Sequence, residues 1–268
     1  MLALIAGEGR LPQILAERLR AEGRDMAVCA YAPEGGVPEG ADLAFRLETL
    51  GSLLKKLQKR GATEVCFAGA IRRPKFDPKK LDLATAPLVP RFLSALGKGD
   101  DGALRVVLEL FESRGMTVRG AHQILPELLP QAGVPTIAQP DEAAKADAAR
   151  AEAIVSALSV ADVGQACVVA RRQALAIEAM PGTDRMLASL ARDRAGLPEG
   201  GILYKAPKAG QDRRVDLPVI GPETIEGAAT AGLSGVVIEA AGVMVLDHRA
   251  VIAAADAAGL FLWVREAG

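Results

Sequence analysis

The sequence is poor in the residues that build most metal and redox sites. It contains two histidines and three cysteines, and the cysteines lie far apart inside apolar stretches. A zinc or iron site rich in imidazole is therefore not expected. The cysteines are predicted to be buried thiols of a reducing compartment and not a disulfide set. Aromatic residues make up only 3% of a chain that is 50% hydrophobic, so the core must consist of Ala, Val, Leu and Ile.

A strong net charge and long apolar runs are also missing. The formal net charge of −1 argues against a general nucleic-acid binder. No apolar run approaches the roughly 20 residues that span a bilayer, and the start MLALIAGEGR lacks the features of a signal peptide. The sequence also lacks the GxSxG motif that presents a nucleophilic serine. We therefore expect a cytoplasmic protein without nucleic-acid partners and without serine–histidine chemistry.

The first half of the chain alternates short apolar segments with amphipathic ones, which predicts an α/β fold. We expect a Rossmann-like domain with a doubly wound parallel sheet over residues 1–131. The predicted elements are strands at residues 2–6, 25–31, 64–68 and 116–118 and helices at 12–22, 51–60, 88–96 and 104–113.

The pattern lapses at residues 132–140, which we interpret as a linker, and a separate C-terminal α/β domain is expected over 141–268. Asp141 is the predicted N-cap of a long Ala-rich helix. The predicted strands of this domain are residues 165–171, 174–179, 201–205, 235–239, 244–247 and 260–264, and its helices are 141–158, 184–194, 223–231 and 249–258.

The loop GEGRLP follows the first predicted strand and opens a helix. Gly7 and Gly9 would let a phosphate approach the backbone at that helix N-terminus. The dinucleotide fingerprint GxGxxG would need a glycine where Pro12 stands. Pro12 is instead suited to the first turn of a helix. The loop therefore predicts a substrate contact or a structural turn, and it disfavours an NAD(P)-dependent oxidoreductase.

Two further loops of the first half carry charge near predicted strand or helix ends. GAIRRP places Arg72 just beyond a strand, where a ligand cleft lies in such sheets. GKGDDG places Lys98, Asp100 and Asp101 at the start of a helix. A single Asp suffices for capping, so the second carboxylate favours a substrate or metal contact. An ordinary surface pair and an ordinary cap are the alternatives.

The segment from Ile177 to Thr224 combines carboxylates and cations with many shape-fixing Gly and Pro residues. Carboxylate oxygens are the natural ligands of Mg²⁺, and Lys and Arg complement phosphate. The segment therefore predicts a metal-assisted phosphate site, with a solvated polar loop as the alternative. The charged residues are Glu178, Asp184, Asp212 and Asp216 together with Lys205, Lys208, Arg213 and Arg214.

Roles can be assigned within this segment. Asp216 is constrained by Leu217-Pro218 and is the best candidate for a metal ligand or a water-orienting base. If strands 174–179 and 201–205 are neighbours, Glu178 and Lys205 meet beside the N–H groups of a helix start. The predicted catalytic residues are Asp216, Asp184 and Lys205, the metal ligands Asp216, Asp212 and Glu178, and the further substrate contacts Thr183, Lys208, Gln211, Arg214 and Thr224, with Arg213 as a bystander.

Longer motifs carry a resemblance that runs nearly from end to end. They are IAGEGRLP, GAIRRP, KGDDGALR, AIEAMPGTDRML and KAPKAGQDRRVDLPVIGPET. The chain resembles the two-domain, metal-dependent UDP-2,3-diacylglucosamine diphosphatases of lipid A synthesis. The resemblance implies water attack on the phosphorus nearest uridine of a UDP-linked diacylated glucosamine lipid. The products would be UMP and 2,3-diacylglucosamine 1-phosphate, and the metal would be Mg²⁺ or another divalent cation such as Mn²⁺.

The resemblance also implies a ligand held between two domains, a homodimer, and peripheral contact with the cytoplasmic face of the inner membrane. One position departs from the family pattern, because Pro181 stands where an acidic residue is expected before Gly182. Either that carboxylate is dispensable or Glu178 and Asp184 take its role. A nucleotide- or lipid-binding module without catalysis is the alternative that this departure leaves open.

Overall fold

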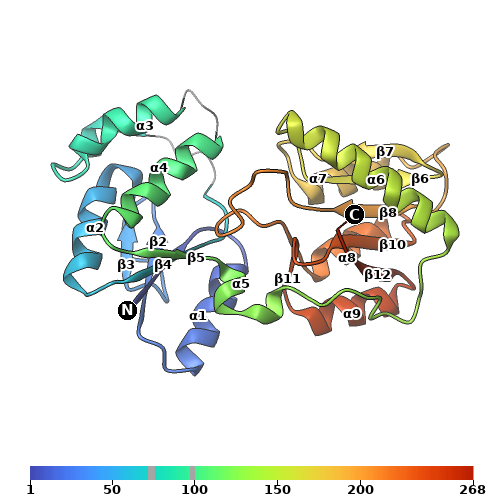
Figure 1. Cartoon of the computed structure of the whole chain (residues 1–268), viewed down its shortest axis with the longest axis horizontal. Helices are drawn as coiled ribbons and strands as arrows, with labels where there is room; N and C mark the ends of the chain where they lie inside the picture. Colours follow the sequence, from blue (N-terminus) through green and yellow to red (C-terminus); the bar gives the residue numbers. More distant parts are fainter. Residues whose placement is uncertain (72–75, 97–99, 268) are drawn as a thin grey trace. The chain divides into compact units, whose positions relative to one another are not determined.

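The structure is a computed structural model that describes residues 1–71, 76–96 and 100–267, with side chains left out at 93–96, 100, 101 and 103 (Figure 1). It contains two compact units, Met1–Leu125 and Pro126–Gly268. Each unit has its own sheet, so each is described by itself. No helix in the described ranges is both long and apolar enough to cross a membrane.

The first unit is built on a five-stranded sheet in which every pairing is parallel. The strand order is β3-β2-β1-β4-β5, which matches the first five strands of the Rossmann order 3-2-1-4-5-6. The predicted parallel, doubly wound sheet is thereby confirmed. The strands are β1 (Leu2–Ala6), β2 (Met26–Tyr31), β3 (Leu43–Phe45), β4 (Glu64–Ala68) and β5 (Thr117–Arg119).

The helices of this unit pack through leucine faces that the sequence periodicity predicts. Leu15 and Leu19 of the first helix are fully buried, and so are Leu54 and Leu57 of the second. Pro12 lies in the first turn of its helix, where its missing N–H costs nothing. The helices are α1 (Leu11–Ala21), α2 (Leu50–Lys59), α3 (Val89–Leu96), α4 (Asp100–Glu112) and α5 (Ala121–Ile124), with short 3₁₀ turns at Leu47–Thr49, Pro78–Lys80 and Ala86–Leu88.

The second unit contains a mixed five-stranded sheet in the order β12-β10-β8-β6-β7. Strands β8, β10 and β12 run parallel, whereas β6 runs antiparallel to both β8 and β7. The main strands are β6 (Ala166–Ala170), β7 (Gln173–Ile177), β8 (Ile202–Lys205), β10 (Gly235–Glu239) and β12 (Phe261–Arg265). A separate parallel pair is formed by β9 (Val219–Ile220) and β11 (Met244–Val245).

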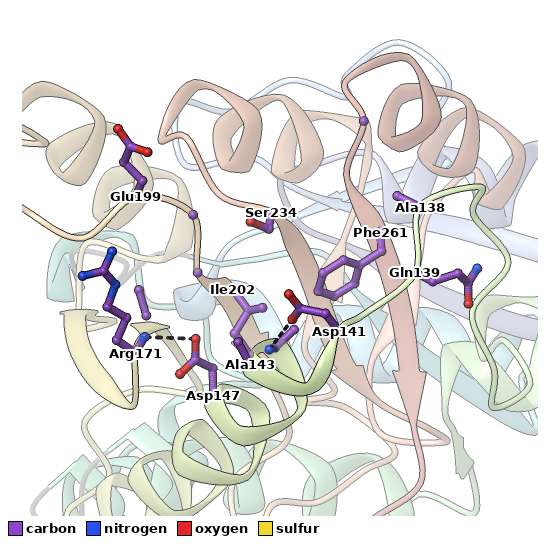
Figure 2. A pocket seen from close by; sticks show the side chains of 15 residues that line it. Ala138, Gln139, Asp141, Ala143, Asp147, Arg171, Glu199, Ile202, Ser234 and Phe261 are labelled. Atoms are coloured by element: carbon purple, nitrogen blue, oxygen red, sulfur yellow. Dashed lines mark hydrogen bonds between the residues drawn. The ribbon is translucent and has the colours of Figure 1, made fainter.

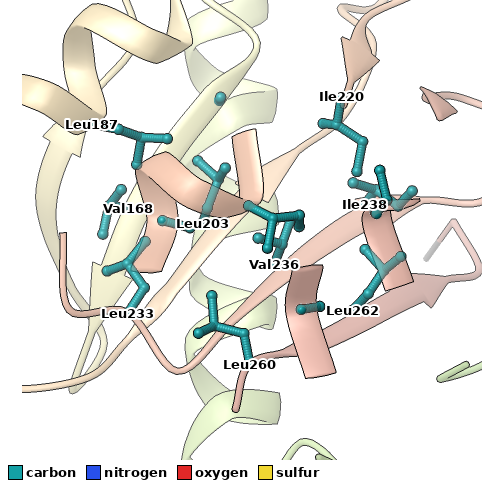
Figure 3. Close-up of a cluster of buried hydrophobic side chains, with 14 of the residues drawn as sticks. Val168, Leu187, Leu203, Ile220, Leu233, Val236, Ile238, Leu260 and Leu262 are labelled. Carbon is teal, nitrogen blue, oxygen red and sulfur yellow. The ribbon is translucent and has the colours of Figure 1, made fainter. Parts of the chain in front are cut away.

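Helices cover both faces of this sheet. Apolar residues of the sheet pack with those of three helices, as in the cluster of Val168, Leu187 and Leu203 (Figure 3). On the other face a long helix approaches through small side chains, including Ala148 and Ala151. Alanine at these positions lets the helix lie close to the strands. The helices are α6 (Glu142–Val160), α7 (Thr183–Arg192), α8 (Pro222–Thr230) and α9 (His248–Ala257), and a 3₁₀ turn spans Pro126–Leu128.

The start of the second unit is fixed by polar contacts. Asp141 accepts a hydrogen bond of 2.7 Å from the Ala144 N–H, so its predicted role as the N-cap of α6 is confirmed. Gly133, in the segment interpreted as a linker, exchanges two backbone hydrogen bonds of 2.9 Å with Val264 of β12. This part of the predicted linker is therefore attached to the edge of the second sheet.

Strands 174–179 and 201–205 are not neighbours, so the condition set for the meeting of Glu178 and Lys205 is not met; β6 lies between β7 and β8. The hairpin turn explains the arrangement. Arg171 and Arg172 both adopt left-handed conformations, with φ of 50° and 62°, which suits a tight two-residue hairpin turn. The buried carboxylate of Asp147 on α6 accepts hydrogen bonds from both of their N–H groups, at 3.1 and 2.5 Å. The turn sends β7 to the outer edge of the sheet.

Candidate functional site

Polar residues of the second unit gather where its parallel strands end. Lys205 is the last residue of β8, and Glu239 and Arg265 end β10 and β12. The register pairs Lys205 with Ile238 and with Ala166, so the antiparallel strand β6 begins at the same edge. Ligands of open α/β sheets bind beyond the carboxyl ends of the strands. We call this place the carboxyl edge.

A buried network joins Glu178, Thr183 and Lys205 at the carboxyl edge. The Lys205 ammonium donates to the Thr183 hydroxyl at 2.8 Å and to the Val219 carbonyl at 3.0 Å. The Thr183 hydroxyl in turn donates to Glu178 Oε1 at 2.6 Å. The other oxygen, Oε2, accepts from the Gln165 N–H at 2.9 Å. The three residues therefore meet as expected, although their strands are not neighbours.

The network places opposite charges close together away from water. Glu178 and Lys205 are each only 6% exposed. Burial lowers the pKa of Lys205, while the charges of Glu178 and Asp184 oppose that shift. Since two of its three N–H donors are used inside the protein, Lys205 is built to hold Thr183 and the β9 backbone in place. A lysine that bound an exposed phosphate directly would need its ammonium at the surface.

The network fixes the first residue of α7. Gly182 precedes the helix with φ of 86°, a conformation that favours glycine, and it provides no side-chain cap. The first-turn N–H groups of a helix carry partial positive charge and suit an anion. Asp184, the second residue of the helix, is exposed to solvent beside them. The start of α7 thus combines main-chain donors with an accessible carboxylate.

Gly164 allows the β7 end to come this close. A Cβ atom at Gly164 would lie 2.1 Å from the Glu178 carbonyl oxygen, so no larger residue fits without displacing that strand. Lys208 and Ala209 are held by residues at the end of α6. Lys208 Nζ lies 2.5 Å from Asp162 Oδ1. The Ala209 N–H also donates to Ser159 Oγ at 2.6 Å. The end of α6 therefore supports the segment that follows β8.

That segment, residues 206–218, holds five of the predicted site residues, namely Lys208, Gln211, Asp212, Arg214 and Asp216. Gln211 accepts from the Lys208 N–H at 2.9 Å and donates through Nε2 to Asp216 Oδ2 at 2.5 Å. Arg214 pairs with Asp212 through Nη2 and Oδ2 at 2.6 Å. The Asp212 carbonyl accepts from the Asp216 N–H at 3.1 Å, which closes a turn. Asp216 itself is exposed.

The predicted metal ligands do not form a preassembled cage. Within the described residues, no group of three His, Cys, Asp or Glu side chains is placed to hold an ion. Glu178 has both oxygens engaged, whereas Asp212 and Asp216 lie on one turn near solvent. Mg²⁺ commonly takes one or two carboxylates together with phosphate oxygens and water. Asp212 and Asp216 supply oxygen ligands of this chemistry, with Arg214 now on Asp212 and Gln211 on one oxygen of Asp216.

The remaining predicted contacts are spread over both units. Thr224 is buried and accepts from the Gly221 N–H at 3.3 Å, so it shapes the start of α8. Arg72 and Lys98 lie outside the described residues. Asp100 and Asp101 begin α4, and their side chains are not described.

The glycine loop of the first unit is joined to the loop after β4. Glu8 and Ala70 exchange two backbone hydrogen bonds, of 2.8 and 3.0 Å. A Cβ at Gly7 would lie 2.6 Å from the Ala70 carbonyl oxygen, so Gly7 is required by close packing. Gly9 has φ of 100° and open space around it. Of the two predicted contacts, Gly9 therefore has the accessible backbone.

Glu239 was not singled out by the sequence. It ends β10, and burial raises the pKa of its carboxyl above the ordinary value; Arg213 and Arg265 oppose this shift and Glu152 adds to it. A strand that ends in a carboxylate at the carboxyl edge was the available signal. This signal was missed because the sequence VVIE is typical of any apolar strand that ends in a polar residue.

A hollow of about 370 Å³ lies at the other end of the strands of this sheet, where β8, β10 and β12 begin (Figure 2). Asp141, Asp147, Arg171 and Glu199 are among its lining residues. Asp141 caps a helix and Asp147 holds the hairpin turn, so both have structural roles there. We place the site at the carboxyl edge because the predicted cations and carboxylates of residues 177–224 gather there.

A Rossmann-like unit followed by an α/β unit with charged side chains at its carboxyl edge defines a two-domain α/β protein suited to an anionic ligand. Residues 1–128 match the LpxI N-terminal domain, and residues 131–263 match the LpxI C-terminal domain. The chain belongs to the LpxI family, and the resemblance predicted from the motifs is confirmed.

One named relative and one solved structure are similar to this chain to very different degrees. UDP-2,3-diacylglucosamine pyrophosphatase LpxI of Caulobacter vibrioides is 40% identical over 274 residues, covering 97% of this chain and 96% of that protein. The solved structure of CobK precorrin-6A reductase covers all of this chain and 88% of its own, with 17% identity and a TM-score of 0.32. That likeness is too low to carry an argument.

Proposed function

We propose that the protein is a hydrolase that cleaves the pyrophosphate bond of UDP-2,3-diacylglucosamine. The observation that carries this proposal is the 40% identity, over nearly the full length of both chains, to a relative named for that activity. Water would attack the phosphorus nearest uridine, and the products would be UMP and 2,3-diacylglucosamine 1-phosphate. The charges at the carboxyl edge support the same chemistry.

A pyrophosphate diester carries two negative charges that repel an attacking water. The N–H groups in the first turn of α7, which have no side-chain cap, together with Lys208 and Arg214, would offset these charges. Lys205 would act indirectly: its hydrogen bond fixes Thr183, and Thr183 is the first residue of α7. Preorganised donors of this kind stabilise developing charge without reorganising during the reaction.

Asp216 is the proposed base that orients or deprotonates the water. It is exposed, and Gln211 holds one of its oxygens, so the carboxylate has a defined direction. Leu217 and Pro218 follow it and are buried, which anchors its backbone. Asp184, at the start of α7, is the second candidate for this role.

We further propose Mg²⁺, or another divalent cation such as Mn²⁺, as the cofactor, held by Asp216 and Asp212. Bound there, the ion would supply a Lewis acid for the phosphate oxygens. Arg214 pairs with Asp212, so this side chain would have to share its carboxylate. Glu178 as a third ligand stays a prediction, and it would require one of its present hydrogen bonds to break.

The lipid substrate also motivates proposals about partners. A diacylated substrate lies in a membrane, so peripheral contact with the cytoplasmic face of the inner membrane is proposed, as is a homodimer. The first unit would contribute substrate contacts through Gly7, Gly9 and Arg72, and through the KGDDG loop that contains Lys98, Asp100 and Asp101.

The test is release of UMP from UDP-2,3-diacylglucosamine in detergent micelles by the purified protein. In ¹⁸O-labelled water, attack at the phosphorus nearest uridine puts the label into UMP, whereas attack at the other phosphorus puts it into the lipid phosphate. Added Mg²⁺ should support the reaction, and a thorough chelator should stop it. A folded protein that binds the lipid but leaves it intact would favour the non-catalytic binding module.

A further inference from the structure

Glu239 lies at the carboxyl edge, between the ends of β8 and β12. It is the last residue of β10, the strand between β8 and β12. Its neighbour Ile238 pairs with Lys205, so Glu239 is one position beyond the level of the buried network. Its side chain is only 16% exposed. A carboxylate held this far from water, at the end of a central strand, needs a partner or a purpose.

Arg213 provides a contact with Glu239 from the segment above the edge. Its Nη2 lies 3.7 Å from Glu239 Oε1. Other charged groups face the same carboxylate from neighbouring elements, namely Glu152 of α6 and Arg265 of β12. Glu152 and Arg265 are themselves paired at 2.8 Å. Arg213 therefore brings a positive charge to Glu239 from outside the sheet.

The backbone around Glu239 is packed to admit this contact. A Cβ at Gly242 would lie 2.7 Å from Glu239 Oε1 and 2.8 Å from the Pro207 ring. Gly242 thus leaves room both for the carboxylate and for the first residues of the segment. The Gly242 N–H donates to the Glu239 carbonyl at 3.2 Å, which keeps this turn in place.

The position of Arg213 within the segment gives the contact its significance. Arg213 stands between Asp212 and Arg214, which are paired with each other. Fixing Arg213 on the sheet therefore fixes the residues on either side of it. The start of the segment is held by α6 through Asp162 and Ser159, and its end by buried Leu217. The Arg213–Glu239 contact falls between these anchors.

We propose that Glu239 is a positioning residue, which acts through Arg213 to hold segment 206–218 over the carboxyl edge. The inference rests on the proposed function for its effect on turnover, and on geometry alone for its effect on the segment. Glu239 does not act on the phosphate; it sets where Asp212 and Arg214 stand. Arg213, which was predicted to have no role in the site, is the residue through which Glu239 acts.

The experiment compares Glu239→Gln, Arg213→Gln and the double variant with wild type. The control is Glu226→Gln, which changes an exposed carboxylate on α8. Amide hydrogen exchange across 206–218 is measured without substrate, and kcat and KM for UMP release are measured separately. We expect faster exchange confined to the segment and a loss in kcat/KM of about tenfold or more in each single variant, because small misplacements of site groups are costly.

The double variant should lose no more than the worse single variant, since the two residues act as one unit. The control should match wild type in both measurements. Exchange within twofold of wild type in both single variants would overturn the proposal, and so would losses that add in the double variant. A wild-type protein that releases no UMP would overturn the proposed function, while the exchange result would still decide the role of Glu239. Arg213 is 58% exposed, so Arg213→Gln keeps the test open if Glu239→Gln fails to fold.

Discussion

The Lys205 ammonium donates a hydrogen bond of 2.8 Å to the hydroxyl of Thr183, which ties the end of β8 to the first residue of α7. The sequence separates these residues by 22 positions, and only the fold brings them together. The tie places the helix N-terminus at the carboxyl edge, where its N–H groups are available to an anion.

Replacing Thr183 by Val removes the hydroxyl and preserves the shape of the side chain. Lys205 and Glu178 would each lose a buried partner, which costs about 1–3 kcal/mol of unfolding free energy for each unsatisfied group. UMP release should fall as well, because the start of α7 is no longer fixed. Thr183→Ser keeps the hydroxyl and should stay near wild type in both urea unfolding and turnover. Equal behaviour of Val and Ser would show that the hydroxyl has no role.

Replacing Lys205 by Met leaves the Glu178 carboxylate buried without its cation. Lys205 reaches Glu178 through the Thr183 hydroxyl, and removing its charge leaves the buried carboxylate uncompensated, which should lower the unfolding free energy by about 3–5 kcal/mol. Adding Glu178→Gln removes the stranded charge and should recover part of the loss. Urea unfolding at neutral pH measures both variants, and Lys145→Met, at an exposed position on α6, is the control. If the single variant lost less than about 1 kcal/mol of unfolding free energy, the charge of Lys205 would make no important contribution to stability.

Replacing Asp216 by Ala tests the proposed base. We expect a folded protein that still binds the UDP-lipid and whose turnover falls at least about a hundredfold, the scale of losing a major acid–base or electrostatic group. Asp193→Ala, an exposed carboxylate just beyond α7, should behave as wild type. Near-normal turnover in the Asp216 variant would transfer the role to Asp184 or to another group.

The three buried thiols predict a loss of stability at alkaline pH. Burial raises the pKa of Cys29, Cys66 and Cys167 from 9.0 to about 12. Above pH 9 the unfolded chain releases these protons and the folded chain keeps them, so the unfolding free energy falls by about 1.4 kcal/mol per pH unit for each thiol.

Other groups modify this alkaline slope in known directions. Burial raises the pKa of Tyr204 to about 12, so this phenol adds to the fall above pH 10. Lys205, whose pKa is lowered, opposes the fall as pH approaches 10.5, because the unfolded chain then binds the extra proton. Urea unfolding between pH 8 and 10.5 measures the slope. Cys167→Ala should reduce it, and a slope that is flat or positive in wild type would contradict the prediction.

Periodicity and apolar runs were sufficient for most of the fold. In the first unit, the leucine faces of α1 and α2 and the apolar strands are all buried, as an apolar face must be when it packs against a neighbouring layer. Two of the shortest strands were not predicted: β3 has three residues, and β9 has two. Runs of that length carry no periodic signal, and only pairing in the folded chain identifies them.

Strand order was less predictable than strand position. Nothing in the local sequence of β7 says whether it pairs with β6 alone or also with β8. The left-handed turn at Arg171 and Arg172, held by the buried carboxylate of Asp147 from 24 positions earlier, fixes only the pairing of β7 with β6. The order follows from β8, which pairs with the other side of β6. The chemistry of the site was visible as charge in a Gly- and Pro-rich segment. The partners of each charge were not visible, since Asp162 and Glu239 come from distant elements.

The reversed direction of β6 gives the carboxyl edge something that an all-parallel sheet does not have, which is the beginning of a strand. Just before that beginning, the Gln165 N–H donates to Glu178. A main-chain donor survives nearly every substitution at its own position, and only proline would delete it. The orientation of Glu178 therefore does not depend on which side chain stands at residue 165, and proline is the substitution there that would release it.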